Sequence, residues 1–172
     1  MGHANNRMKH RIAYRNLPQL LLKARDRLMS HFRPILNHFG LTEQQWRILR
    51  VLDEHGQLEP WELCEMCQIL SPSMAGVLAR MEETGLVHRA RMTEDQRRVI
   101  VRLAPKGDQL LTEMAPLIDE QYLQIEHAYG KRVFDDLFKA LEGFIEADSN
   151  PPPQVDLPAR AKPAPRKKGG NS

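Results

Sequence analysis

The sequence predicts a mainly α-helical fold that contains one small β-hairpin. Between residues 16 and 147, most segments repeat apolar side chains at the three- and four-residue spacing of amphipathic helices. Residues 86–92 and 98–103 have strand character, the segment between them has turn composition, and Leu58 is a candidate for one very short further strand. The 172 residues are enough for one domain with a sizeable core.

The N-terminal part predicts an arm followed by two helices. Residues 1–15 are polar, basic and without period, so we expect a flexible basic arm. A long amphipathic helix is expected over residues 16–39, and Pro34 inside it predicts a kink near Ser30. Residues 42–45 (TEQQ) have the capping-box pattern that begins the next helix.

A helix-turn-helix is predicted within residues 60–85. Ser71 and Pro72 are a strong helix start, because serine can cap free backbone N–H groups and proline fits the first helical position. The face opposite the apolar stripe of this second helix carries small or hydroxylated side chains and one arginine. Such a face can approach a major groove closely. The residues of this face that we expect to meet DNA are Ser71, Ser73, Gly76 and Arg80.

The hairpin that follows is basic, and a helix-turn-helix joined to a basic hairpin is typical of a wing. The net charge of +3 is not the argument, because the middle of the chain is acidic and only the local placement of arginines matters. We expect Arg89, Arg91 and Arg98 to lie near phosphates, within a DNA-binding lobe of residues 42–104. The alternative is a plain α+β core fragment whose arginines are solvated.

The first and last helical regions predict a homodimer. Residues 16–39 and 105–147 are too long and too apolar to be buried by so small a lobe. A two-fold dimer buries them and places two recognition helices for adjacent major grooves of a pseudo-palindrome. Alternatively, the apolar stripes make the chain a winged-helix module for binding another protein. Residues 148–172 are rich in proline and lysine, and we expect them to be disordered.

Residues 16–147 resemble the MarR (multiple antibiotic resistance regulator) family of dimeric winged-helix repressors. The motifs that carry the resemblance are LSPS at 70–73, RMEETGLV at 80–87 and DQRRVIVRLAPKG at 95–107. The last resembles the family's wing signature, although Ala104 replaces the usual threonine, which removes a helix cap. The resemblance implies that Arg97 inserts into the minor groove and that Asp95 holds it, or a neighbouring arginine, by a salt bridge.

Residues 16–25 and 41–50 look most like regulators of aromatic-acid catabolism, of the homoprotocatechuate branch, and regulators of hydroxynicotinate breakdown are similar. The resemblance implies a repressor that a small aromatic carboxylate releases from double-stranded operator DNA. Residues that suit such an effector can grip a carboxylate, cover a ring or read a hydroxyl. They are Arg15 from the partner chain, Ser30, His31, Trp46 and Arg47. Alternatively, Trp46 is core, and His31 and Arg47 are solvated or internally paired.

Cys64 and Cys67 form a CxxC pair, which leaves a thiol- or metal-responsive regulator as an alternative. Only one such pair exists, so one chain cannot supply four cysteines to zinc, and half-buried packing is the favoured role. We therefore expect no metal and no cofactor. The two cysteines also fit a reducing compartment.

The sequence does not indicate an enzyme. It contains no phosphate-cradling glycine loop, no HExxH motif and no nucleophile elbow. No apolar run approaches the roughly 20 residues that span a bilayer, and the basic N-terminus has no signal-type apolar segment. We expect a cytoplasmic protein with no membrane partner.

Overall fold

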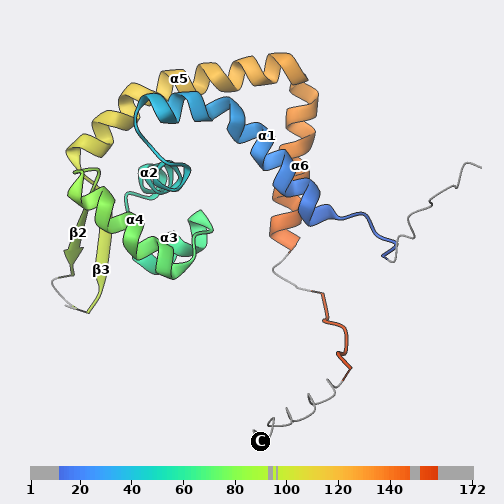
Figure 1. Ribbon diagram of the computed structural model, residues 1–172, viewed down its shortest axis with the longest axis horizontal. Coiled ribbons are helices and arrows are strands. Elements are labelled where there is room, and N and C mark those ends of the chain that lie inside the picture. The colour runs from blue at the N-terminus through green and yellow to red at the C-terminus, as the bar shows by residue number, and fades with distance from the viewer. Residues whose placement is uncertain (1–11, 93–94, 96, 148–151, 159–172) are drawn as a thin grey trace, which may run out of the picture. The chain divides into compact units, whose positions relative to one another are not determined.

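The computed structural model describes residues 12–92, 95, 97–147 and 152–158. The chain divides into two units, Met1–Gly130 and Lys131–Ser172. The helices, labelled in Figure 1, are α1 Leu17–His38, α2 Glu43–His55, α3 Pro60–Cys67, α4 Ser71–Glu83, α5 Pro105–Tyr129 and α6 Lys131–Glu146. The strands are β1 Gln57–Leu58, β2 Val87–Arg91 and β3 Val99–Leu103. This mainly helical arrangement with a small sheet confirms the predicted fold class.

The two terminal segments were expected to be an arm and a tail without regular structure. Most of residues 1–15 and 148–172 lies outside the described residues, and the described parts, 12–15 and 152–158, contain no helix or strand. Within the described part of the chain, no helix is long and apolar enough to cross a membrane.

The first helix begins and ends as its flanking residues predict. Asn16 precedes α1, and its side-chain oxygen accepts a hydrogen bond of 3.0 Å from the backbone N–H of Gln19. The helix then continues as one element through Pro34 to His38, and Gly40 turns the chain with a φ of +68°. Phe32 of α1 packs on Tyr122 of α5, with ring centroids 4.7 Å apart, so these two helices are in contact along part of their length.

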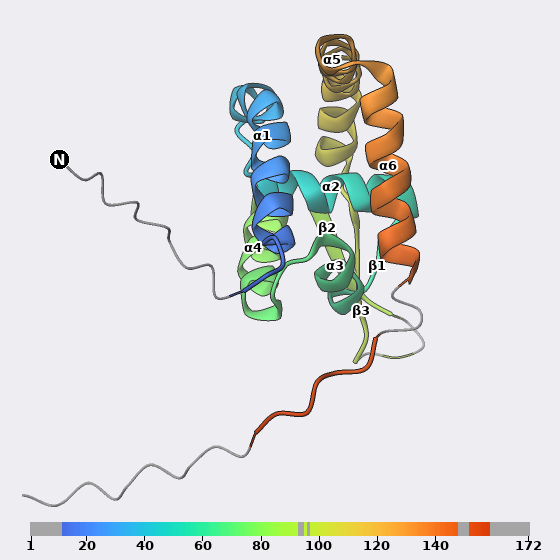
Figure 2. The same cartoon turned by 90° about the vertical axis from the view of Figure 1, so that its right-hand side faces the viewer.

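The second helix is central to the first unit. The capping box of Thr42 and Gln45 is formed, because each side chain binds the backbone N–H of the other residue. Helix α2 contacts every other helix of its unit as well as β1 and β3, and Figure 2 shows it crossing the lobe. Its fully buried side chains include Ile48, Leu49 and Leu52. They place the core between the helix-turn-helix and the longer helices.

The three strands form one antiparallel sheet in the order β1-β3-β2. Leu58 of β1 pairs with Val101, and Val87 of β2 pairs with Leu103, so the short first strand extends the predicted hairpin. Val87 and Val101 are completely buried. The base of the wing is therefore part of the core, while most residues of β2 beyond Val87 are exposed.

Helix α4 begins differently from the sequence expectation, which made Ser71 its cap. The cap position is Leu70, whose backbone is extended and whose carbonyl accepts hydrogen bonds from the N–H groups of Ser73 and Met74. Ser71 is already the first helical residue and its side chain makes no capping bond. The chain enters the helix one residue early because buried Ile69 and its N–H bond to the Cys64 carbonyl already fix the preceding turn.

The junction of α4, β2 and α5 needs two glycines. Gly85 has a φ of +77° and ends α4 as predicted, with the N–H of Leu86 bonded to the carbonyl of Met81. Gly107 lies in the first turn of α5, where a Cβ atom would come within 2.2 Å of the Leu86 carbonyl oxygen. Ala104 precedes that helix and makes no side-chain capping bond, as its departure from the family's threonine predicts.

Candidate nucleic-acid interface and effector region

The exposed face of α4 carries all four residues that the sequence assigns to the major groove. Ser71, Ser73, Gly76 and Arg80 are exposed, whereas the opposite stripe is buried and includes Met81. A Cβ atom at Gly76 would meet nothing within 4 Å. The glycine therefore serves no packing purpose in the folded chain, and its small size leaves room for an external partner.

The first strand of the wing is attached to α4 by an ion pair. Arg89 of β2 donates to one carboxylate oxygen of Glu82 from Nε at 2.8 Å and from Nη2 at 2.5 Å. Its backbone N–H also donates to the other oxygen of Glu82 at 3.2 Å. These hydrogen bonds lower the pKa of Glu82, so the carboxylate stays charged. The sequence predicts that Arg89 lies near DNA phosphates, but in the folded chain its guanidinium is already bound to Glu82.

The second strand of the wing is attached to α3. Arg98 precedes β3, and its Nε donates to Oε1 of Glu59 at 3.0 Å, with Nη2 also in contact. Glu59 stands immediately before α3, and its backbone N–H is bound by the side chain of Glu62 at 2.7 Å. The hydrogen bond from Arg98 is the largest influence that lowers the pKa of Glu59. Arg98, like Arg89, holds the wing in place within the chain.

Of the wing tip, the structure describes residues 95, 97 and 98 but not 93, 94 or 96. A carboxylate oxygen of Asp95 accepts a hydrogen bond of 3.0 Å from the backbone N–H of Arg97. No ion pair between Asp95 and an arginine side chain is formed among the described residues, but, after the hydrogen bond to Glu59, the charge of Asp95 contributes to raising the pKa of the neighbouring Arg98. A carboxylate two residues before an N–H reaches it locally, so Asp95 shapes the turn through the backbone instead.

Three arginines of the interface have no ion-pair partner among the described residues. Arg80 of α4, Arg91 at the end of β2 and Arg97 at the wing tip are exposed. Their guanidinium groups carry charge that the described acidic residues do not neutralise. Since one positive group lies on the recognition helix and two on the wing, the charge is placed where an extended polyanion could meet both elements.

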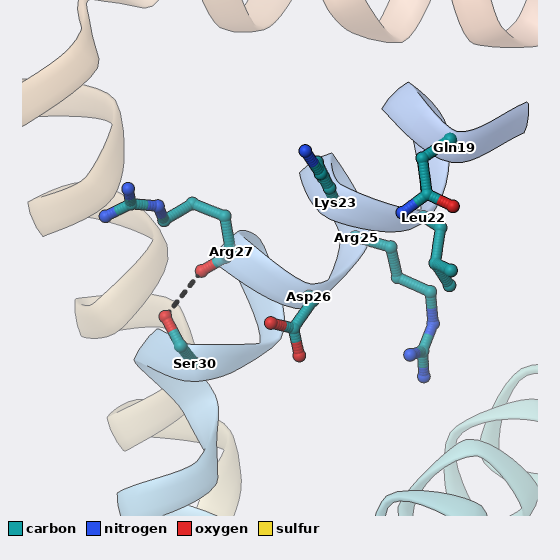
Figure 3. Close-up of a pocket in the computed structure, with 7 residues that line it drawn as sticks. All are labelled: Gln19, Leu22, Lys23, Arg25, Asp26, Arg27 and Ser30. Atoms are coloured by element: carbon teal, nitrogen blue, oxygen red, sulfur yellow. Dashed lines mark hydrogen bonds between the residues drawn. The ribbon is translucent and has the colours of Figure 1, made fainter. Parts of the chain in front are cut away.

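The predicted effector residues do not come together within one chain. Ser30 lines a depression of about 770 Å³ on the surface of α1, shown in Figure 3, and donates to the Arg27 carbonyl at 2.6 Å. Arg15 lines a second depression of about 350 Å³ at the start of α1. His31 instead contacts the Tyr129 hydroxyl, 3.2 Å from its Nε2. None of the other predicted effector residues lines either depression.

Trp46 is buried, and Arg50, which was not among the predicted effector residues, lies over its ring. The guanidinium carbon of Arg50 is 5.6 Å from the ring centroid, and its Nη2 forms a surface ion pair with Glu54 at 3.2 Å. Arg50 is four residues after Trp46 on the same helix, so helical spacing was the signal that could have found it. This pair joins an aromatic surface to a half-exposed cation.

Arg47 lies elsewhere. Its Nη1 contacts the carbonyl of Cys67 and lies 3.5 Å from that of Gln68, at the end of α3. From the sequence, Arg47 could either grip an effector or be paired internally, and the structure forms the internal pairing. The guanidinium is directed to the helix-turn-helix because the carbonyls at a helix end lack intrahelical donors.

A network of four charged residues, which the sequence did not reveal, links α1 to the start of α2. Arg33 donates to Glu43 at 2.8 Å and to Asp26 at 2.5 Å, and Arg25 donates to the second oxygen of Glu43 at 2.8 Å. The hydrogen bonds from Arg33, more than those from Arg25, lower the pKa of Glu43. Arg25 and Asp26 lie 18 and 17 residues before Glu43 in the sequence, and Arg33 lies 10 before it. Charge patterning along one helix therefore could not reveal the network.

The cysteine pair has the properties of packing rather than of a sensor. Cys67 is buried, and burial raises the pKa of its thiol to about 11, so it is protonated at neutral pH. Cys64 is half-buried. Among the described residues, no group of three or more His, Cys, Asp or Glu side chains is arranged to hold a metal ion.

Comparison with known proteins identifies the family. Residues 41–99 match the sequence profile of the MarR family. The homoprotocatechuate degradative operon repressor of Escherichia coli is 40% identical over 138 residues, which is 80% of this chain and 92% of the relative. The transcriptional regulator FarR of Neisseria gonorrhoeae is 45% identical over 111 residues, covering 64% and 76% of the two chains.

A solved structure agrees with these relatives. The crystal structure of NadR in complex with 4-hydroxyphenylacetate is 37% identical and superposes with a TM-score of 0.71 over 77% of this chain and 96% of that one. The relatives are transcriptional regulators and not enzymes, as the sequence predicted. The chain belongs to the MarR family of winged-helix transcriptional regulators, in the branch that includes the homoprotocatechuate operon repressor.

Proposed function

We propose that the protein is a homodimeric repressor of aromatic-compound catabolic genes. It binds a pseudo-palindromic operator and leaves it when a small aromatic carboxylate, of the hydroxyphenylacetate or hydroxynicotinate type, is bound. The single observation that supports DNA reading best is the exposed, small-residue face of α4 beside Arg80, Arg91 and Arg97, none of which is paired among the described residues. A major-groove helix and a basic wing need these two features together.

In this proposal the residues of the interface have separate roles. Ser71, Ser73, Gly76 and Arg80 meet the major groove, Arg97 enters the minor groove, and Arg91 lies near phosphates. Arg89 and Arg98 act mainly by fixing the wing to α4 and α3, because Glu82 and Glu59 occupy their guanidinium groups. Asp95 acts by shaping the wing tip.

The dimer is supported by apolar side chains that a single chain leaves exposed. Helix α1 exposes several leucines near its start, namely Leu17, Leu20, Leu21 and Leu22. Helix α6 by itself exposes an apolar set that includes Phe138, Phe144 and Ile145. Soluble monomers rarely expose so many large apolar side chains on neighbouring turns. A second copy would cover them and bring Arg15 towards the effector region.

The effector class is supported by chemistry and by a relative. NadR, 37% identical, was crystallised with 4-hydroxyphenylacetate, an aromatic ring that carries a carboxylate. Here Trp46 offers a ring surface and Arg50 a guanidinium beside it. We propose that Arg50, in place of Arg47, grips the effector carboxylate, and that Ser30 and His31 read its hydroxyl. Glu54 is the group that the carboxylate would displace from Arg50.

The experiment measures release of DNA by aromatic acids. A duplex enriched by the protein from a random-sequence pool is labelled, and its anisotropy is followed while 4-hydroxyphenylacetate, phenylacetate or 6-hydroxynicotinate is added. We expect release by at least one of these acids. Arg50→Met should keep the DNA affinity and need roughly tenfold more acid, because a charged hydrogen bond is lost.

The matched control for this experiment is Arg132→Met, which removes an exposed arginine of α6 that pairs with Asp136 on the surface. It should respond to the acids like the unaltered protein. If no acid releases the duplex, the effector proposal is wrong while DNA reading stands. If the protein enriches no sequence, DNA reading itself is wrong.

A further inference from the structure

We propose that Arg47 is a positioning residue for DNA reading: from α2 it fixes the turn between α3 and α4, and so sets the direction in which α4 meets the major groove. This inference rests on the proposed DNA-reading role of α4. It assigns to a residue outside the helix-turn-helix a part in sequence recognition that requires no contact with DNA.

The contacts of Arg47 are with two successive backbone carbonyls. Its Nη1 binds the carbonyl of Cys67, the last residue of α3, and lies 3.5 Å from the carbonyl of Gln68. Carbonyls at a helix C-terminus carry partial negative charge and lack an intrahelical donor. A guanidinium has several donors in a fixed plane, so it can hold both groups in one orientation.

The turn that Arg47 contacts is in a conformation that needs support. Gln68 has a φ of +51° and a ψ of 50°, and it is the only non-glycine with positive φ among the described residues. Its side-chain Nε2 donates to the carbonyl of Glu65 at 2.6 Å. A side chain in this left-handed region is strained, so the conformation persists only where neighbouring contacts determine it.

The turn is also short enough to transmit its orientation to α4. Three residues, Gln68 to Leu70, separate the end of α3 from the start of α4. Of these, Ile69 is buried and its N–H is bonded to the Cys64 carbonyl, while Leu70 is already the cap position of α4. A change of dihedral angle at Gln68 therefore has no flexible linker to absorb it, and it would rotate the exposed face of α4.

The burial of the Arg47 Nε atom indicates that the guanidinium is there for more than packing. Its Nε is buried and has no hydrogen-bond partner within the described part of the chain. Leaving a buried donor unpaired is unfavourable, and methionine would fill similar space without that penalty. The advantage that offsets the penalty lies at the other end of the side chain, where Nη1 holds the turn.

The experiment compares specific with unspecific DNA affinity. The full chain first enriches a duplex from a random-sequence pool, and dissociation constants are then measured for that duplex and for an unrelated duplex of equal length over a range of salt concentrations. Arg47→Met should reduce the ratio of specific to unspecific affinity, that is, the dissociation constant for the unrelated duplex divided by that for the enriched duplex, about tenfold, because an ion-assisted contact that orients α4 is lost. The constant for the unrelated duplex and its salt slope should not change, since no phosphate-contacting arginine is altered.

A control separates positioning from general stability. Ile48→Val removes one methyl group from the fully buried core of the same helix. It should lower the melting temperature while keeping the ratio of specific to unspecific affinity. In hydrogen exchange, the amides of residues 69–74 should lose protection in Arg47→Met relative to Ile48→Val.

A conservative variant keeps the inference testable if Arg47→Met does not fold. Lysine retains the charge and the stem but offers one ammonium instead of a planar fork. Arg47→Lys should fold and bind the unrelated duplex normally. Its ratio of specific to unspecific affinity should lie between that of the unaltered protein and the roughly tenfold lower ratio expected of Arg47→Met. A ratio in Arg47→Lys equal to that of the unaltered protein, or equal ratios in Arg47→Met and Ile48→Val, would overturn the inference. Enrichment of no sequence by the unaltered protein would instead refute the DNA-reading role on which it rests.

Discussion

Glu59 and Arg98 are 39 residues apart in the sequence, and their side chains form the ion pair that attaches the start of β3, at the tip end of the wing, to the start of α3, with Arg98 Nε 3.0 Å from Oε1. Arg89 and Glu82 form the corresponding attachment between β2 and α4, with Nε 2.8 Å from Oε2. Both wing strands are thus joined to helices of the helix-turn-helix. The orientation of the wing relative to the recognition helix depends on these two carboxylates.

The attachment at Glu59 predicts a pH dependence of wing protection. Arg98 lowers the pKa of Glu59 below its ordinary value of 4.5. The stabilisation is therefore complete above that value and is lost as the pH falls through the lower pKa of the folded state. Glu59→Gln should reduce hydrogen-exchange protection factors in β3 at pH 7, and the difference from the unaltered protein should shrink in acid. Equal protection of β3 at pH 7 would argue against this attachment.

Arg97 at the wing tip predicts a loss of DNA affinity without a loss of stability. Its side chain is exposed and has no ion-pair partner among the described residues, so Arg97→Ala should change the melting temperature very little. If the guanidinium lies between phosphates in the minor groove, the slope of log affinity against log salt should become shallower by about 0.9. Lys139→Ala removes an equal charge from exposed α6 and is the control. An unchanged slope in Arg97→Ala would exclude the wing assignment.

Replacing Gly76 by alanine should change stability and DNA affinity in opposite directions. A Cβ atom there meets nothing in the folded chain, so Gly76→Ala should stabilise α4 by about 0.5–1 kcal/mol through helix propensity. The same methyl group would project from the face proposed to enter the major groove, and operator affinity should fall. Denaturant unfolding and anisotropy titration measure the two effects. A variant that is more stable and binds the operator as tightly would remove Gly76 from the interface.

Replacing Gly107 by alanine should cause a large loss of stability, in contrast to Gly76→Ala. Its added Cβ would lie 2.2 Å from the Leu86 carbonyl oxygen, which belongs to the backbone and cannot move independently. Gly107→Ala should cost about 1–3 kcal/mol in the free energy of unfolding, the usual range of overpacking. Gly143→Ala in α6, where a Cβ meets nothing within 4 Å, should be neutral or stabilising. Similar unfolding free energies for the two variants would contradict the close approach of α5 to Leu86.

The sequence by itself determined the elements and their order, because the interactions that define them lie within a few residues. The capping box at Thr42, the left-handed stop at Gly85 and the two paired strands of the hairpin are local patterns, and each appears in the structure as predicted. The exposed face of α4 was equally readable, since helical spacing separates a buried stripe from the residues opposite it.

The tertiary structure alone decided which charged groups are free to act on a partner. Arg47, Arg89 and Arg98 look in the sequence like cations available to a ligand or to phosphates, yet each is held by a group that folding brings near. Arg50 gained a candidate role from its position over Trp46. Charge pairing depends on distances of a few ångströms between residues up to 39 positions apart, and no local pattern records such distances.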